Sequence, residues 1–302
     1  MTWSAKAAVA EADTAVVTTL DAAYCIGLLP RRDPLGHKGT FGTVVCIAGS
    51  LDYIGAALLT CLSAVRGGAG LVVLAVPQAL QTIVAGRVPE VVTLGLPRES
   101  ATALALIEGV QPDALVVGPG LTENADNYKL VDRTLRSDGA PAVVDAGALT
   151  LLAVTPDQLE RRGRQCVLTP HPGEFARMTG TAVGPDDRER QERTALTAAQ
   201  LGQVIVLKGA RTVIADPEGR IAMSPFANAA LATAGSGDVL AGLIGALLAQ
   251  GVAPFDAACL GVYLHGRAGE RLAWRFGDAG LIASDLPLEI ALARHELSAH
   301  SA

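Results

Sequence analysis

The stretch ATAGSGDVLAG, residues 232–242, places glycines, a serine and an aspartate directly before a long apolar run. That run is typical of a buried helix, which we expect over residues 236–250. Gly235, Ser236 and Gly237 then leave backbone N–H groups uncovered at the N-terminus of the helix, where the helix dipole is positive. Such an end binds anions, so the stretch predicts a site for a phosphoryl group.

Asp238 falls in the first turn of this helix and has two interpretations. A carboxylate there caps the helix and stabilises it by about 0.5–2 kcal/mol. A cap alone does not require three small residues before it, which favours anion binding. In that setting Asp238 would act as a general base on a substrate hydroxyl. The sequence contains no GxxxxGK[ST] motif and no GxGxxG after a strand, so a nucleotide would have to bind through another loop design.

Strand-like and helix-like segments alternate over the rest of the chain. Continuous apolar runs predict buried strands within residues 43–50, 71–76, 91–96, 114–120, 141–152, 165–180 and 203–210. The turn residues DPEG predict a hairpin within 211–224. This pattern is typical of an α/β fold with a mostly parallel central sheet and helices on both faces. Glycine turns after several of the strands are expected to line one rim of the sheet, where such folds bind ligands.

Composition narrows the functional classes. The net charge of −6 and the lack of a Lys/Arg cluster argue against a nucleic-acid partner. No apolar run reaches the length of a membrane span, and the N-terminus lacks the pattern of a signal peptide. The five cysteines form no CxxC pair, and we expect buried, reduced thiols in a cytoplasmic protein. They are Cys25, Cys46, Cys61, Cys166 and Cys259.

With these motifs in view, the chain resembles the ADP-dependent NAD(P)H-hydrate dehydratases of the ribokinase-like superfamily. Besides the opening stretch, eight segments match in order: HKGTFGTVVCIAGS (37–50), GAALLTCLSAVRGGAGLV (55–72), VVGPGL (116–121), VVDAGAL (143–149), LTPHPGEFARMTG (168–180), VLKGARTVI (206–214), YLHGRAGE (263–270) and ASDL (283–286). The match covers about residues 27–290. It implies a single ribokinase-like domain at 27–302 behind an N-terminal extension at 1–26, whose first 20 residues we expect to be loosely ordered or a short helix.

The resemblance implies a repair reaction. The family restores the S epimer of hydrated NADH or NADPH, called NADHX and NADPHX, at the expense of ADP or, in other members, ATP. Hydroxide is a poor leaving group, and phosphorylation of the ring hydroxyl makes it a good one, so the products include AMP and phosphate. Gly235, Ser236, Gly237 and Asp238 would be catalytic, with Asp238 taking the hydroxyl proton and the N–H groups holding the developing charge. The resemblance leaves open ADP against ATP, and NADHX against NADPHX.

The remaining site residues also follow from the resemblance. Nucleotide contacts fall on Lys208, Gly209, Ala210, Arg211, Thr212 and Gly237. Substrate contacts fall on Ala56, Gly120, His171 and Asp238. Plainer interpretations stand beside these: a strand end with a solvated arginine at 208–212, helix and turn packing at Ala56 and Gly120, and a turn closed by His171.

Three further side chains have less specific roles. Asp145 would bind substrate or water-held magnesium, or hydrogen-bond the next turn. Glu174 would cap or charge the helix that follows it, and His265 is expected to be a core histidine. The charged run 186–193 is interpreted as an exposed helix face. The sequence has no cluster with transition-metal spacing, so the expected metal is Mg²⁺ carried by the nucleotide phosphates.

The resemblance further implies a homo-oligomer, in this family often a tetramer, and a separate epimerase that acts on the same hydrates. The alternative function in the same fold is a small-molecule kinase for a vitamin precursor alcohol, of the hydroxymethylpyrimidine or thiazole type. A nucleotide-sensing module without turnover is a third possibility. Hydrated NADH supplied with ADP distinguishes the three, because only the dehydratase regenerates the reduced nicotinamide.

Overall fold

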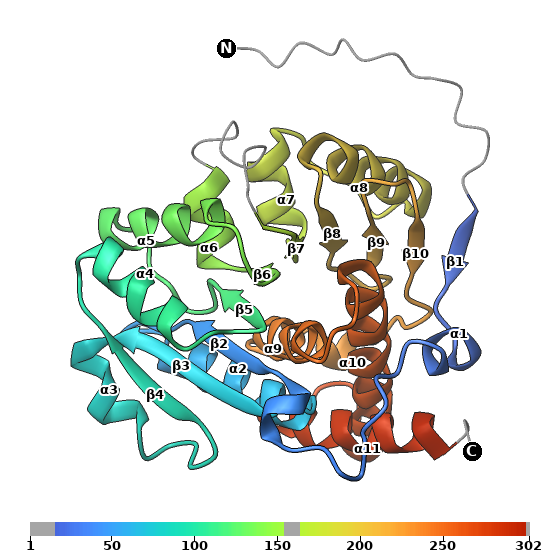
Figure 1. Cartoon of the computed structure of the whole chain (residues 1–302). Helices are drawn as coiled ribbons and strands as arrows, with labels where there is room; N and C mark the ends of the chain where they lie inside the picture. Colours follow the sequence, from blue (N-terminus) through green and yellow to red (C-terminus); the bar gives the residue numbers. More distant parts are fainter. Residues whose placement is uncertain (1–15, 154–163, 300–302) are drawn as a thin grey trace.

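A computed structural model describes residues 16–153 and 164–299 and shows one ten-stranded sheet flanked by helices (Figure 1). The strands are β1 Val17–Thr19, β2 Thr43–Ile47, β3 Leu71–Pro77, β4 Val92–Leu96, β5 Ala114–Val117, β6 Ala142–Val144, β7 Cys166–Leu168, β8 Val204–Leu207, β9 Val213–Ala215 and β10 Ile221–Met223. Their order across the sheet is β1-β10-β9-β8-β7-β6-β5-β2-β3-β4. All pairs are parallel except β8–β9 and β9–β10. The mostly parallel α/β sheet predicted from sequence is therefore confirmed.

Helices cover both faces of this sheet. They are α1 Ala22–Ile26, α2 Ile54–Arg66, α3 Gln78–Val84, α4 Ser100–Gly109, α5 Ala125–Arg136, α6 Gly147–Ala153, α7 Pro172–Thr179, α8 Asp187–Leu201, α9 Ser236–Ala249, α10 Pro254–Phe276 and α11 Leu286–Ala299. One core cluster contains buried residues of α2, α3, α9, α10 and α11, and the other contains those of α4 to α8. In β2, Val44 and Cys46 belong to the first cluster and Val45 and Ile47 to the second. This two-sided burial accounts for the continuous apolar runs of the strands.

The predicted hairpin is present as β9 and β10, with Val213 opposite Met223. The N-terminal segment differs from its prediction. Residues 17–19 are neither loose nor helical, because β1 pairs in parallel with β10 and adds an edge strand. Its β-branched residues favour a strand, and Leu20, immediately after it, is fully buried. The last part of the expected extension at 1–26 thus packs against the sheet, while residues 1–15 lie outside the described residues.

The five cysteines are buried and free, as predicted. None of the described helices combines the length and the apolar character needed to cross a membrane.

Tight turns follow the central strands at their carboxyl ends. Gly118, after β5, has φ +124°, and a Cβ on it would lie 1.8 Å from the carbonyl oxygen of Asp145. Gly147, after β6, would likewise bring a Cβ within 2.1 Å of the Leu121 carbonyl oxygen. Glycine is needed at both turns because the backbones approach too closely for any side chain. The turns hold the ends of β5 and β6 together and place Asp145 at the rim of the sheet.

Candidate active site

Helix α9 begins with an open N-terminus. Gly235 precedes it with φ +89°, a left-handed conformation that glycine adopts readily. No side chain caps this end, and the Ser236 hydroxyl donates instead to the Leu231 carbonyl oxygen at 2.8 Å. The interpretation of Asp238 as a helix cap is therefore wrong. The Ser236 backbone N–H donates to the Thr233 carbonyl oxygen at 3.3 Å. Among the described residues no hydrogen bond engages the N–H groups of Gly237 and Asp238, which stay available for an anion.

The Asp238 carboxylate is poised to exchange a proton near neutral pH. Its pKa is raised from 3.8 to about 7, chiefly by burial and then by the Asp145 carboxylate; the Lys208 ammonium opposes the rise and the Glu174 carboxylate adds to it. Within the part of the chain that the structure describes, no hydrogen bond reaches this carboxylate. A half-buried carboxylate with such a pKa suits a general base, since the ideal catalytic pKa lies near the working pH.

A lysine and two carboxylates lie beside Asp238. The Lys208 ammonium, after β8, is 2.7 Å from Asp145 Oδ1, after β6, and 3.8 Å from Glu174 Oε2, after β7. Burial alone would lower the pKa of Lys208, but the two carboxylates outweigh it, so the pKa is raised and the lysine stays charged. Because β6, β7 and β8 are neighbours, the sheet itself brings these three side chains together. We call Asp145, Glu174, Lys208 and Asp238 the charged cluster.

His171 stands at the N-terminus of α7 and is held by that helix. Its Nδ1 accepts hydrogen bonds from the backbone N–H groups of Gly173 at 3.0 Å and Glu174 at 3.2 Å. In return the Glu174 carboxylate accepts from the His171 backbone N–H at 2.8 Å. This reciprocal capping box is the plainer role foreseen for both residues. It also fixes the half-exposed imidazole at the margin of the charged cluster, with its Nε2 3.6 Å from Glu174 Oε1.

Two glycines bring backbone close to the site. A Cβ on Gly237 would lie 3.3 Å from Lys208 Nζ and 4.0 Å from Asp145 Oδ2, so the first turn of α9 stands over the charged cluster. Gly120, with φ +70°, would place a Cβ 2.6 Å from the Tyr53 carbonyl oxygen and 3.1 Å from the Ala56 methyl group. Ala56 and Gly120 are therefore packed against each other on the α2 side of the rim.

The loop after β8 separates its residues. Lys208 turns inward, whereas Arg211 is half exposed and pairs with Asp187 of α8 at 2.5 Å. The Thr212 hydroxyl donates to the Gly209 carbonyl oxygen at 3.2 Å, and Ala210 is exposed. The loop thus presents its 209–212 backbone outward and its lysine to the charged cluster.

Arg190 was missed by the sequence analysis. Residues 186–193 were interpreted as an exposed face, but Arg190 is buried and its Nη2 donates to the Leu207 and Lys208 carbonyl oxygens at 3.1 and 3.2 Å. A Cβ on Gly209 would lie 2.7 Å from the same nitrogen. Arg190 therefore shapes the end of β8. Its position four residues before buried Thr194 is the signal that marks it as inward-facing.

His265 lies behind the anion-binding loop and is buried, as predicted for a core histidine. Its Nε2 is 3.0 Å from the Ser236 carbonyl oxygen. Burial lowers its pKa to about 4, so the ring is neutral at pH 7 and donates a hydrogen bond to that carbonyl.

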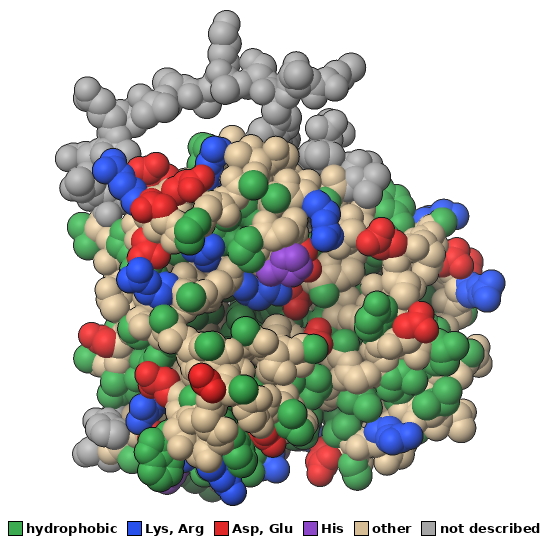
Figure 2. Space-filling view, turned by 180° about the vertical axis from the view of Figure 1, so that it is seen from behind, with side chains coloured by type: hydrophobic (Ala, Val, Ile, Leu, Met, Phe, Trp, Pro, Cys, Tyr) green, Lys and Arg blue, Asp and Glu red, His purple; other side chains and the backbone are tan. Residues whose placement is uncertain are grey.

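Within the described residues, no group of three or more His, Cys, Asp or Glu side chains is arranged to hold a metal ion. Figure 2 shows one face of the molecule with a hollow near its middle, where basic, acidic and histidine side chains gather.

With this geometry established, comparison with known proteins identifies the family. A family model described as "Carb_kinase: NAD(P)H-hydrate dehydratase" matches residues 44–291. The chain belongs to the NAD(P)H-hydrate dehydratase family. The ADP-dependent (S)-NAD(P)H-hydrate dehydratase of Bacillus subtilis is 40% identical over 242 residues, which cover 80% of this chain and 85% of that relative. The crystal structure of the ADP/ATP-dependent NAD(P)H-hydrate dehydratase from Bacillus subtilis, co-crystallized with ATP/Mg²⁺, is 34% identical and superimposes with a TM-score of 0.80. The superposition covers 93% of this chain and 99% of the Bacillus subtilis chain.

Other members of this dehydratase family are longer. The bifunctional NAD(P)H-hydrate repair enzyme Nnr of Moorella thermoacetica is 44% identical over 274 residues, covering 88% of this chain and 52% of that relative. The chain therefore spans about half the length of this and several similar repair enzymes.

Proposed function

We propose that this chain dehydrates the S epimer of NADHX or NADPHX back to NADH or NADPH, using ADP and releasing AMP and phosphate. The observation that carries the proposal is the half-buried Asp238 carboxylate beside the uncapped N-terminus of α9. That pairing supplies a proton acceptor and an anion site at adjacent positions. The name of the Bacillus subtilis relative supports ADP as the phosphoryl donor and the S hydrate as the substrate.

In the proposed reaction Asp238 accepts the proton of the ring hydroxyl as its oxygen attacks the terminal phosphorus of ADP. The bond from that phosphorus to the bridging oxygen breaks, and AMP leaves. Backbone N–H groups of residues 235–237 hold the negative charge that develops on the transferred phosphoryl group. The lone pair of the ring nitrogen then expels phosphate and leaves an iminium ion. Loss of a proton from the neighbouring ring carbon to water or to the released phosphate restores the ring double bond and so the reduced nicotinamide.

The other members of the charged cluster would prepare Asp238 for this step. Lys208 ion-pairs with Asp145, so a full positive charge stays next to the open N-terminus of α9. Asp145 Oδ2 faces the Gly237 turn. This oxygen would hold Mg²⁺ through a bridging water molecule. Mg²⁺ on the nucleotide phosphates would neutralise part of their charge. Because carboxylate oxygens suit Mg²⁺, Asp145 fits an ion that the nucleotide phosphates carry and that water bridges to the protein.

Substrate and nucleotide would approach from two sides of α9. We place the hydrated nicotinamide beside Ala56, Gly120 and the fixed edge of His171, and the nucleotide along the outward backbone of residues 209–212. We also propose a homotetrameric, cytoplasmic enzyme, on the strength of the family resemblance and of the buried free thiols. An epimerase activity would work with it, because relatives of about twice the matched length are named bifunctional repair enzymes.

Purified protein, (S)-NADHX and ADP test the proposal directly. We expect the absorbance of reduced nicotinamide to return, with AMP and phosphate formed in equal amounts. Parallel reactions with ATP, and with NADPHX, establish the two preferences. A hydroxymethylpyrimidine or thiazole alcohol tests the kinase alternative, which predicts a stable phosphorylated product. Nucleotide binding without turnover of any hydroxylated substrate would leave only a sensing role. The family match to dehydratases disfavours the kinase.

A further inference from the structure

A cavity lies at the ends of α2 and α9 that are far from the candidate active site. The first turn of α2 contains Ala56, which packs against Gly120, whereas Arg66 and Gly68 at its other end line the cavity. Helix α9 begins at the anion-binding loop and ends just before Gln250, whose side chain reaches the same region. The cavity has a volume of about 840 Å³, which is in the range of small-molecule sites.

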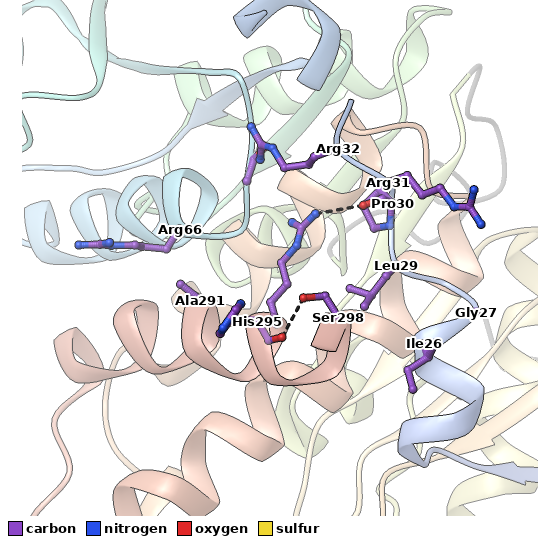
Figure 3. A pocket seen from close by; sticks show the side chains of 12 residues that line it. Ile26, Gly27, Leu29, Pro30, Arg31, Arg32, Arg66, Ala291, His295 and Ser298 are labelled. Carbon is purple, nitrogen blue, oxygen red and sulfur yellow. Dashed lines mark hydrogen bonds between the residues drawn. The ribbon is translucent and has the colours of Figure 1, made fainter. Parts of the chain in front are cut away.

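The walls of this cavity are basic. Arg31, Arg32, Arg66, Arg294 and His295 line it, and no aspartate or glutamate does. Figure 3 shows Arg31 and Arg66 at opposite sides, with His295 of α11 between them. Among the described residues, none of the four arginines forms an ion pair, although the chain carries more acidic than basic residues overall. We call these five residues the arginine pocket.

Two of the arginines are held in place by neutral groups. Arg294 donates to the Gly67 carbonyl oxygen and, at 3.0 Å, to the Gln250 side-chain oxygen. Arg32 donates to the Gly68 carbonyl oxygen at 2.8 Å, and its guanidinium lies 3.9 Å from the centroid of the Phe41 ring. These contacts orient both guanidinium groups without neutralising them.

The two groups are also neighbours. A Cβ on Gly68 would lie 2.6 Å from Arg294 Nη1 and 2.8 Å from Arg32 Nη1. Burial, with the Arg32 charge adding to it, lowers the pKa of Arg294 to about 10, which leaves it charged at neutral pH. The carbonyl groups at the end of α2 carry roughly half a negative charge in total. That is enough to attract one cation and too little to balance two, so the pocket retains excess positive charge.

We propose that the arginine pocket binds a small phosphate-bearing polyanion. Guanidinium groups match phosphate oxygens in geometry and charge, and two pre-oriented forks side by side suit a di- or triphosphate better than a single carboxylate. The limited, partly open volume between residues 26–32, the end of α2 and α11 favours a compact ligand over an extended acidic peptide. This proposal rests on residues outside the candidate active site and does not depend on the dehydratase reaction.

Calorimetric titration with tripolyphosphate tests the pocket. We expect binding to the native protein that weakens about tenfold or more in Arg32→Gln and in Arg66→Gln, because each removes a charged hydrogen bond to phosphate. Arg98→Gln, an exposed arginine outside the pocket, is the matched control and should bind as the native protein does. Circular dichroism and a thermal melt confirm that each variant is folded.

Crystals soaked with tungstate, a tetrahedral dianion, locate the site. We expect anomalous density within hydrogen-bonding distance of Arg294 or Arg32, in addition to any at the N-terminus of α9. Density at α9 alone, or unchanged tripolyphosphate affinity in both pocket variants, would overturn the proposal. So would a crystal in which a segment of a second copy of the chain fills the pocket and excludes the anion.

Discussion

Replacing Asp238 with asparagine tests two effects of its carboxylate: proton transfer in the proposed reaction, and the loss of folding stability when the carboxylate ionises. The Asp238→Asn variant keeps the shape of the side chain, and its amide cannot accept the hydroxyl proton. If Asp238 is the general base, turnover should fall by about 10²–10⁴ while nucleotide affinity changes little. Stopped or continuous assays with (S)-NADHX and ADP give the turnover, and calorimetry with ADP gives the affinity.

The pH dependence follows from the raised pKa. The ionised carboxylate is the active base, so kcat/KM of the native enzyme should rise through pH about 7 and level off above it. The variant should lack this rise, because it has no group at that position to titrate. As a control, native enzyme that has been held at each pH is returned to pH 7 and assayed there. Full recovery of activity excludes irreversible inactivation.

Stability should change in the opposite sense. A pKa raised from 3.8 in the unfolded chain to about 7 in the fold means that ionisation opposes folding. The associated stability is fully present below pH 3.8, declines as pH rises, and is lost above pH 7, a difference of roughly 4 kcal/mol. The neutral amide of the asparagine variant avoids that loss. Urea unfolding should therefore show the variant gaining about 3 kcal/mol more, relative to the native protein, at pH 8 than at pH 4.5.

Two results would refute this reasoning. Near-native turnover of the asparagine variant would leave Asp238 without a catalytic role. A stability difference that does not grow with pH would show that the carboxylate is not the desolvated group inferred from its surroundings.

Three other changes test the site. Gly237→Val should weaken ADP binding at least tenfold in calorimetry, because a β-branched side chain fills the space over Lys208 Nζ. The control is Gly109→Val, at a glycine with open space around it. Equal ADP affinities of the two variants would contradict the loop assignment. Lys208→Met removes the charge that lowers the pKa of Asp238, so the midpoint of the pH–rate profile should move upward; an unmoved midpoint argues against their coupling. The native protein should lose stability as pH falls from 6.5 to 4, because His265, with a pKa of about 4, stays neutral in the fold and protonates when the chain unfolds. The His265→Gln variant should lose up to about 3 kcal/mol less over the same range, as measured by urea unfolding. Identical acid sensitivity of the two proteins would show that His265 titrates normally.

Most of the fold could be predicted from local patterns in the sequence. Buried parallel strands are continuous apolar runs, and the Gly-Ser-Gly turn before α9 has few structural alternatives, so both are visible without tertiary information. The parallel pairing of Val17–Thr19 with β10 is different. It joins segments about two hundred residues apart through a strand of three residues, and no local signal encodes such a contact.

The charged cluster shows how far sequence reasoning reaches at the site. Asp145, Glu174 and Lys208 each follow a strand, and the rule that parallel strands end at one rim predicts that they face a common region. Which of them pair depends on the strand order β6-β7-β8, which the sequence does not contain. Arg190 was hidden for a related reason, because a buried arginine in a charged run is revealed only by the carbonyl groups that receive it.

The charges around Asp238 also bear on how a carboxylate serves as base in a site that receives phosphate. The N-terminus of α9 by itself would favour the ionised form of Asp238 and lower its pKa. Burial and the nearby Asp145 and Glu174 carboxylates oppose this more strongly, and the pKa rises to about 7. Lys208 pairs with Asp145 and so limits the rise. An anionic phosphoryl group arriving at the same N–H groups would add repulsion and strengthen Asp238 as a proton acceptor at the step where the hydroxyl must lose its proton.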